Sequence, residues 1–167
     1  PYIVKAIEKN PNLLQARQIM AQIHFRQRDF YLAETELSRV LEKSPGNYEA
    51  NILMGNIRMA SQEMDQARSI YKKLIQGYPD RPAAYFRLGL VENAQGKPDA
   101  ALENLKKALA INPNLMDVFS SIIGIMAGQK KIDQALSLCD SQLEKVEPVP
   151  VIQAMILEMK AKLFVQK

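Results

Sequence analysis

A spacing of 34 residues recurs along the whole 167-residue chain. Two residue types keep this interval over four copies each: alanine at positions 33, 67, 101 and 135, and proline at positions 11, 45, 79 and 113. Because the two series are independent, their agreement indicates an internal repeat rather than chance. A fixed period of this size is typical of a solenoid, in which each repeat is one supersecondary unit that stacks on its neighbours.

Each copy contains two helical patterns. In the third copy, the stretch AAYFRLGLVENAQ places Tyr85, Leu88 and Val91 at helical spacing, and GKPDAALENLKKALAINP carries a second apolar stripe. Between the two patterns, Gly96 permits a tight turn and Pro98 suits the first position of a helix. The recurring proline ends the second helix because it lacks a backbone N–H and disfavours a helical residue before it. We therefore predict helix, turn, helix, turn in each repeat.

The recurring alanine has a packing explanation. A small side chain lets the second helix approach the first closely, and Gly55 and Gly89 supply a matching notch on the first helix. A larger residue at the notch would overpack the contact, at a cost of roughly 1–3 kcal/mol. In the fourth copy Ile123 stands at the notch, with Gly124 beside it, so we expect a shifted or looser contact there. A carboxylate also recurs where it favours the start of the second helix, at Asp65, Asp99 and Asp133.

The pattern resembles the tetratricopeptide repeat (TPR), a 34-residue helix-turn-helix. The matching motifs are Met54-Gly55, Leu88-Gly89, Ala67-x3-Tyr71 and Ala101-x3-Leu105. The tryptophan usual in the first helix is replaced by Arg17, Asn51, Tyr85 and Phe119 in the successive copies. The resemblance covers nearly the whole chain and implies an all-α fold, a right-handed α-solenoid of helix-turn-helix repeats.

The same register predicts how the chain divides. We expect four complete repeats, at residues 14–47, 48–81, 82–115 and 116–149. Residues 1–13 are interpreted as the second helix of a truncated preceding repeat, and residues 150–167 as the first helix of a truncated following one. We expect the parent protein to continue in both directions. The cut ends would expose apolar surface, through which self-association is possible.

The residues that carry chemistry are sparse. The single histidine, His24, falls where the family has a packing tyrosine, and the single cysteine, Cys139, occupies a core position of the repeat. One His and one Cys do not make an ordinary zinc site, and the chain has no phosphate-binding or dinucleotide-binding glycine motif. We therefore predict no catalysis, no metal and no cofactor. Four acidic residues are expected on solvated helix surfaces: Glu34, Glu36, Asp99 and Glu103.

The candidate site follows from residues that the core does not explain. In GNYEANILMGNIRM, at 46–59, a helix would bury Leu53, Met54 and Ile57, which leaves Ile52 and Met59 on another side. The resemblance implies that this side of the first helices lines a concave groove. The candidate peptide-binding residues are Gln22, Phe25, Ile52, Asn56, Met59, Phe86, Leu90 and Asn93. An apolar patch bordered by amides suits a peptide or helix of another protein. The alternative is that these residues pack between neighbouring repeats.

Charge and hydropathy limit the partners. The chain carries a formal charge of +4, but the groove positions include one cation, Arg26, and two anions, Glu49 and Asp117. Nucleic-acid binding needs a basic track, so we predict no nucleic-acid partner. No run approaches the 18 or more apolar residues of a membrane span, so direct membrane insertion is not expected. The sequence leaves the compartment open, cytoplasmic or periplasmic.

Two functional alternatives to a protein-binding scaffold stay open from the sequence. One is a structural spacer or assembly segment of a long TPR array, for example in a bacterial envelope or exopolysaccharide export protein. The other is the recruitment arm of an enzyme whose catalytic domain lies outside this sequence. The family's chaperone-tail clamp is not transferred, because Gln18, Leu53 and Ala83 stand where it requires other polar or basic groups.

Overall fold

The structure is a computed structural model of the chain, and it describes residues 2–10, 13–146 and 148–166. Regular structure in these ranges is α-helical throughout. The chain divides into two compact units, Pro1–Tyr78 and Pro79–Lys167. The first unit contains α1 (Tyr2–Lys9), α2 (Leu14–Arg26), α3 (Phe30–Lys43), α4 (Tyr48–Ala60) and α5 (Met64–Gly77). The second contains α6 (Pro82–Ala94), α7 (Pro98–Ile111), α8 (Met116–Gly128), α9 (Ile132–Lys145) and α10 (Pro150–Gln166).

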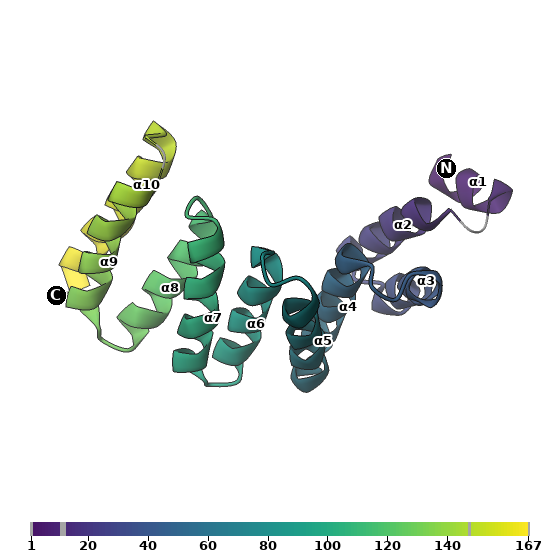
Figure 1. Cartoon of the computed structure of the whole chain (residues 1–167), viewed down its shortest axis with the longest axis horizontal. Helices are drawn as coiled ribbons and strands as arrows, with labels where there is room; N and C mark the ends of the chain where they lie inside the picture. Colours follow the sequence, from purple (N-terminus) through teal and green to yellow (C-terminus); the bar gives the residue numbers. More distant parts are fainter. Residues whose placement is uncertain (1, 11–12, 147, 167) are drawn as a thin grey trace. The chain divides into compact units, whose positions relative to one another are not determined.

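The helix boundaries follow the periodic residues of the sequence. Consecutive pairs such as α2–α3 and α6–α7 are visible in Figure 1, and α2, α4, α6, α8 and α10 begin 34 residues apart. Helices α3, α5 and α7 each end two residues before the proline of the series, at Pro45, Pro79 and Pro113. Pro11, the first member of that series, lies outside the described residues. The division into four repeats with a half repeat at each end stays an interpretation of this register.

The turn inside each pair contains one residue in the left-handed region. Gly96 has φ 72°, and its backbone N–H donates to Asn93 O at 3.0 Å while Lys97 N–H donates to Glu92 O at 2.9 Å. These two hydrogen bonds form a Schellman motif, which satisfies carbonyls at the end of α6. The equivalent turns use residues with side chains in the same region, namely Arg28 (φ 65°), Gln62 (φ 63°) and Lys130 (φ 58°).

The predicted glycine notch is present in both units. A Cβ at Gly55 would lie 2.5 Å from Cε1 of Tyr71, and a Cβ at Gly89 would lie 2.8 Å from Cγ of Leu105. Tyr71 and Leu105 are both fully buried, so the second helix fills the space that each glycine leaves. In the fourth pair Ile123 occupies the equivalent position, and α8 packs more sparsely against α9 than α6 does against α7. The expected loosening of this pair is confirmed.

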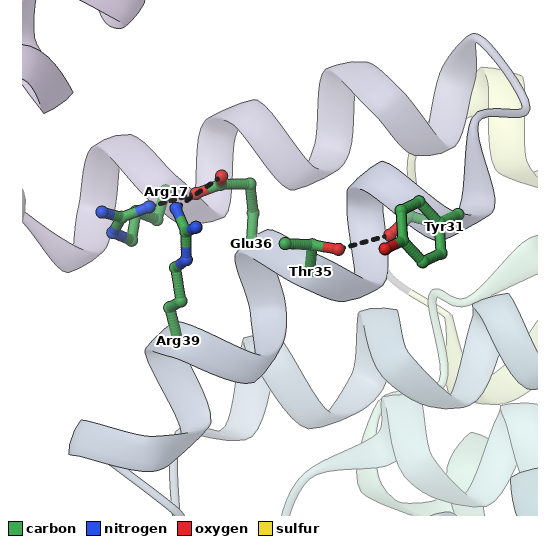
Figure 2. Close-up of polar contacts among 5 residues, drawn as sticks. All are labelled: Arg17, Tyr31, Thr35, Glu36 and Arg39. Atoms are coloured by element: carbon green, nitrogen blue, oxygen red, sulfur yellow. Dashed lines mark hydrogen bonds and ion pairs between the residues drawn. The ribbon is translucent and has the colours of Figure 1, made fainter.

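Two of the carboxylates expected on solvated surfaces are paired with arginine. Arg17, at a position where the family usually has tryptophan, is only 6% exposed. Its Nη1 lies 2.6 Å from Oε2 of Glu36 on α3, and Arg39 approaches the other oxygen of the same carboxylate at 3.4 Å (Figure 2). Glu34 pairs with Arg58 of α4. The prediction for Glu36 was therefore wrong, because two arginines cover a carboxylate whose side chain is only 16% exposed. Glu34 keeps 35% of its side chain exposed, and Asp99 and Glu103 are exposed as expected.

Candidate functional site

In the first unit, the candidate residues come from α2 and α4. Gln22 is exposed, whereas Phe25, Ile52, Asn56 and Met59 are partly buried. Partial burial leaves each of these side chains some surface for a ligand while its remainder contacts the protein. The arrangement is compatible with a binding face and also with packing between neighbouring helices.

Side-chain contacts hold three of these candidate residues of α2 and α4 in place. The ring of Phe25 lies 5.8 Å from that of Phe30, centroid to centroid, and both rings pack against the core of the first unit. The hydroxyl of Tyr71 donates to Oδ1 of Asn56 at 2.9 Å and approaches Sδ of Met59 at 3.6 Å. The amide of Asn56 is therefore held in one orientation by the same tyrosine that fills the notch at Gly55.

In the second unit, α6 carries Phe86, Leu90 and Asn93. Phe86 is partly buried and packs against the core of this unit, and the guanidinium of Arg87 lies 5.5 Å from the centroid of its ring. Leu90 is partly buried and Asn93 is exposed. Spacing of three and four residues places the three side chains along one stripe of the helix.

Two hollows lie along this stripe, between α6 and α8. The first, here called the Phe86 hollow, has a volume of about 380 Å³ and lies where the two helices begin. Its lining comprises Pro82, Ala83, Phe86, Asn114, Leu115, Met116, Asp117 and Val118. The second, the Leu90 hollow, has a volume of about 460 Å³. Its lining comprises Leu90, Asn93, Pro98, Ser121, Gly124, Ile125, Gly128 and Gln129.

Glycine keeps the α8 side of the Leu90 hollow clear. A Cβ built at Gly124 or at Gly128 would have no heavy atom within 4 Å. Neither glycine is therefore required by packing, unlike Gly55 and Gly89. At these two positions the backbone of α8 is accessible from the hollow.

A third hollow, of about 280 Å³, lies between α8 and α10, where no site was predicted from the sequence. Met155, Met159 and Leu163 of α10 form its apolar wall, with Gly124 and Ala127 opposite on α8. An ion pair between Glu158 and Lys162, at 2.6 Å, lies at its edge. The sequence signal for this hollow was the pair of methionines four residues apart in α10, since a flexible thioether suits adaptable binding surfaces.

The structure brings together only part of the predicted site. Leu90 and Asn93 line one hollow, and Phe86 lines the other with Asp117. The candidate residues of α2 and α4 belong to the other unit. A contiguous apolar patch across all eight residues therefore stays a prediction.

The environments of His24 and Cys139 favour packing roles. His24 is partly buried, and its Nδ1 has no hydrogen-bond partner among the described residues. Cys139 is fully buried, and burial raises the pKa of its thiol, which disfavours the nucleophilic thiolate. Within the described ranges, no three His, Cys, Asp or Glu side chains form a group that could hold a metal ion. None of the described helices is both long enough and apolar enough to cross a lipid bilayer.

Comparison with solved structures places the fold among known helical-repeat proteins. PilF of Pseudomonas aeruginosa superposes with a TM-score of 0.75 at 19% identity, covering 98% of this chain and 79% of that one. YrrB, described as a TPR protein with an unusual peptide-binding site, gives 0.70 at 20% identity, covering 100% and 93%. The MamA protein gives 0.70 at 22% identity, covering 86% and 78%. At these identities the similarity shows the fold alone. A search of curated proteins found no match.

A family model gives the assignment. The model of the TT21 fifth ARM repeats domain matches residues 15–112, more than half of the chain, from α2 through α7. The matched stretch contains the Gly55 and Gly89 notches and three of the four left-handed turns. The chain therefore belongs to the family of the TT21 fifth ARM repeats domain, and it is a helical-repeat protein of the tetratricopeptide type.

Proposed function

We propose that the chain is a non-catalytic protein-interaction scaffold that binds a peptide or helix of another protein on the first-helix side of its repeats. The observation that carries the proposal is the pair of hollows between α6 and α8, which adjoin Phe86, Leu90 and Asn93. Exposed apolar surface bordered by amide groups is typical of sites that bind other proteins.

The chemistry of the two hollows supports a peptide ligand. Leu90 and Ile125 supply apolar surface, whereas Asn93 and Gln129 supply amides that can both donate and accept hydrogen bonds. Gly124 lets a ligand backbone approach α8 closely, since its missing Cβ leaves free space. An unusual peptide-binding site is described for YrrB, a protein of the same fold, and this supports a peptide ligand for the present chain.

The expected affinity is modest. Burial of three apolar side chains of a ligand contributes roughly 5–8 kcal/mol, at about 1.5–3 kcal/mol each. Association opposes this by about 4–15 kcal/mol of lost translational and rotational freedom. Micromolar or weaker binding therefore follows for this segment, unless additional repeats of a longer chain add contacts.

Site-specific photo-crosslinking tests the proposal. A photoreactive amino acid at Asn93, which is exposed beside the Leu90 hollow, should crosslink a discrete protein in cells that make this chain. The same group at Ala110, an exposed residue of the second helix α7, is the matched control. The crosslinked product from position 93 should disappear when the Leu90→Ser substitution is added to the same chain. This comparison requires that the chain melts at the same temperature with and without Leu90→Ser.

The outcomes separate this function from its rivals. Equal crosslinking from both positions, or a product that Leu90→Ser leaves unchanged, would contradict binding at the hollow. If the photoreactive group at position 93 gives no crosslinked product in any condition, the structural-spacer interpretation is favoured. A product between two copies of the chain would indicate self-association in place of a foreign ligand.

A further inference from the structure

The polar side chains of the Phe86 hollow present hydrogen-bond acceptors. Asn114 lines the hollow, and its Oδ1 is buried without a hydrogen-bond partner among the described residues. A buried acceptor without a donor is unfavourable. Because this atom has almost no solvent-accessible surface, a ligand N–H group reaches it only when the Asn114 side chain turns toward the hollow. The remaining wall is largely apolar and includes Phe86, Leu115 and Val118.

The only ionic side chain in the lining of this hollow is Asp117. It lies in the first turn of α8 and is exposed. In the part of the chain that the structure describes, its carboxylate has neither an ion pair nor a side-chain hydrogen bond. Two arginines lie close to the lining in sequence, Arg81 before Pro82 and Arg87 over the ring of Phe86, but neither is part of the lining. The hollow thus combines one anion, one buried acceptor and apolar walls.

We propose that the Phe86 hollow accepts a basic side chain, lysine or arginine, from the segment that the scaffold binds. The aliphatic stem of such a side chain contacts Phe86 and Leu115, while its charged head pairs with the exposed Asp117 carboxylate. A turn of the Asn114 side chain toward the hollow would add its Oδ1 as a second acceptor. Long basic side chains bury their stems on apolar surface in this way. This inference rests on the proposed function and specifies the ligand chemistry at one of its two hollows.

One feature of α8 favours the opposite charge. The residue before its first turn, Leu115, gives no side-chain cap, so the first backbone N–H groups of the helix carry the positive end of the dipole. That end would attract an anion. Asp117 already places a carboxylate within the same turn of α8. Its full negative charge exceeds the partial positive charge of the helix dipole, so the hollow keeps a net negative character.

Small capped amino acids provide a direct test on the full chain. N-acetyl-lysine methylamide, its norleucine analogue and its glutamate analogue are titrated separately into isotopically labelled protein. Backbone amide shifts of residues 82–86 and 114–118 report binding at the hollow by NMR. Norleucine has the stem of lysine without the ammonium, so it isolates the contribution of the charge.

The expected result is millimolar binding of the lysine probe, roughly three- to tenfold tighter than that of norleucine, as for a partly exposed charged hydrogen bond. Asp117→Asn should remove most of that preference and leave norleucine binding unchanged. Glu144→Gln, which removes an equal charge from an exposed position on α9, is the matched control and should alter neither.

Each other outcome overturns the inference. Equal binding of lysine and norleucine makes the hollow an apolar subsite, and the proposed function stands without a basic specificity. Tighter binding of the glutamate probe shows that the hollow prefers an anionic side chain, because the positive end of the α8 dipole outweighs the Asp117 carboxylate. No shift with any probe means that the hollow takes no side chain, whereas the crosslink at Asn93 still tests the scaffold function separately.

Discussion

Two helical glycines of the second unit should respond in opposite directions to the same substitution. Gly89 lies within α6 and Gly124 within α8, and both helices contain 13 residues. In a helix interior, replacing glycine by alanine stabilises by about 0.5–1 kcal/mol, because glycine loses more conformational entropy on folding. The difference between the two sites therefore comes from what the added methyl group meets.

At Gly89 the methyl group meets the second helix of the pair. Its Cβ would lie 2.8 Å and 2.9 Å from Cγ and Cδ2 of Leu105, and 3.2 Å from the backbone oxygen of Ala101. Leu105 is fully buried and Ala101 contributes backbone, so α7 has to move. Overpacking of this kind costs about 1–3 kcal/mol, which exceeds or equals the helix-propensity gain. Gly89→Ala should be destabilising by up to about 2 kcal/mol, after that gain is subtracted.

At Gly124 the methyl group meets nothing within 4 Å, so only the propensity gain remains. Gly124→Ala should therefore stabilise by about 0.5–1 kcal/mol. Urea denaturation followed by circular dichroism measures both variants against the parent chain, with the slope of the transition checked for change.

A double-variant cycle isolates the cause at Gly89. Leu105→Ala removes the side chain that the new methyl group would strike, so Gly89→Ala should become neutral or stabilising in that background. If Gly89→Ala proves as stabilising as Gly124→Ala in the parent chain, the notch does not set the distance between α6 and α7. A cost that persists undiminished beside Leu105→Ala would assign the effect to something other than this contact.

Three further predictions concern other parts of the chain. Arg17→Ala should cost about 1–3 kcal/mol in urea denaturation because it leaves a partly buried carboxylate without its main partner, whereas Arg39→Ala, at a side chain that is 54% exposed, should cost less than about 1 kcal/mol. The Cys139 thiol, buried and with a raised pKa, should resist a thiol reagent in native protein at mildly alkaline pH and react fully in urea; rapid native labelling would contradict its burial. Gly96→Ala should lower the unfolding free energy by about 1 kcal/mol because φ is 72°, and an unchanged thermal midpoint would show that the turn relaxes.

The sequence was sufficient for the elements that depend on local rules. Proline at a fixed interval ends a helix whatever surrounds it, so the ends of α3, α5 and α7 could be placed from residues alone. The glycine opposite a buried side chain is a contact between two helices, but its recurrence made it predictable, and Gly55 and Gly89 meet the size requirement. The repeated pattern helped, because each copy tests the interpretation made on another.

Contacts between helices that do not recur from copy to copy could not be predicted in the same way. Nothing in the residue type of Glu36 indicates that Arg17, 19 positions earlier, reaches it and removes it from solvent. The packing of Phe25 on Phe30 also escaped the pattern, since a partly buried aromatic ring fits both a groove and a core. The hollow between α8 and α10 depends on the distance between two helices, which the spacing of residues does not contain.

The fourth pair differs from the others through the position of one glycine. In the second and third pairs glycine faces the second helix, whereas in the fourth pair Ile123 holds that position and glycine follows at 124. A shift of one residue along an α-helix corresponds to a rotation of about 100°. The glycine at 124 therefore faces the hollows along α8 instead of the contact with α9. The sparser packing of α8 on α9 and the cleared surface at Gly124 are then two results of the same displacement. If Ile123 were glycine and Gly124 isoleucine, α8 should pack like α6, and the surface available to a ligand should shrink.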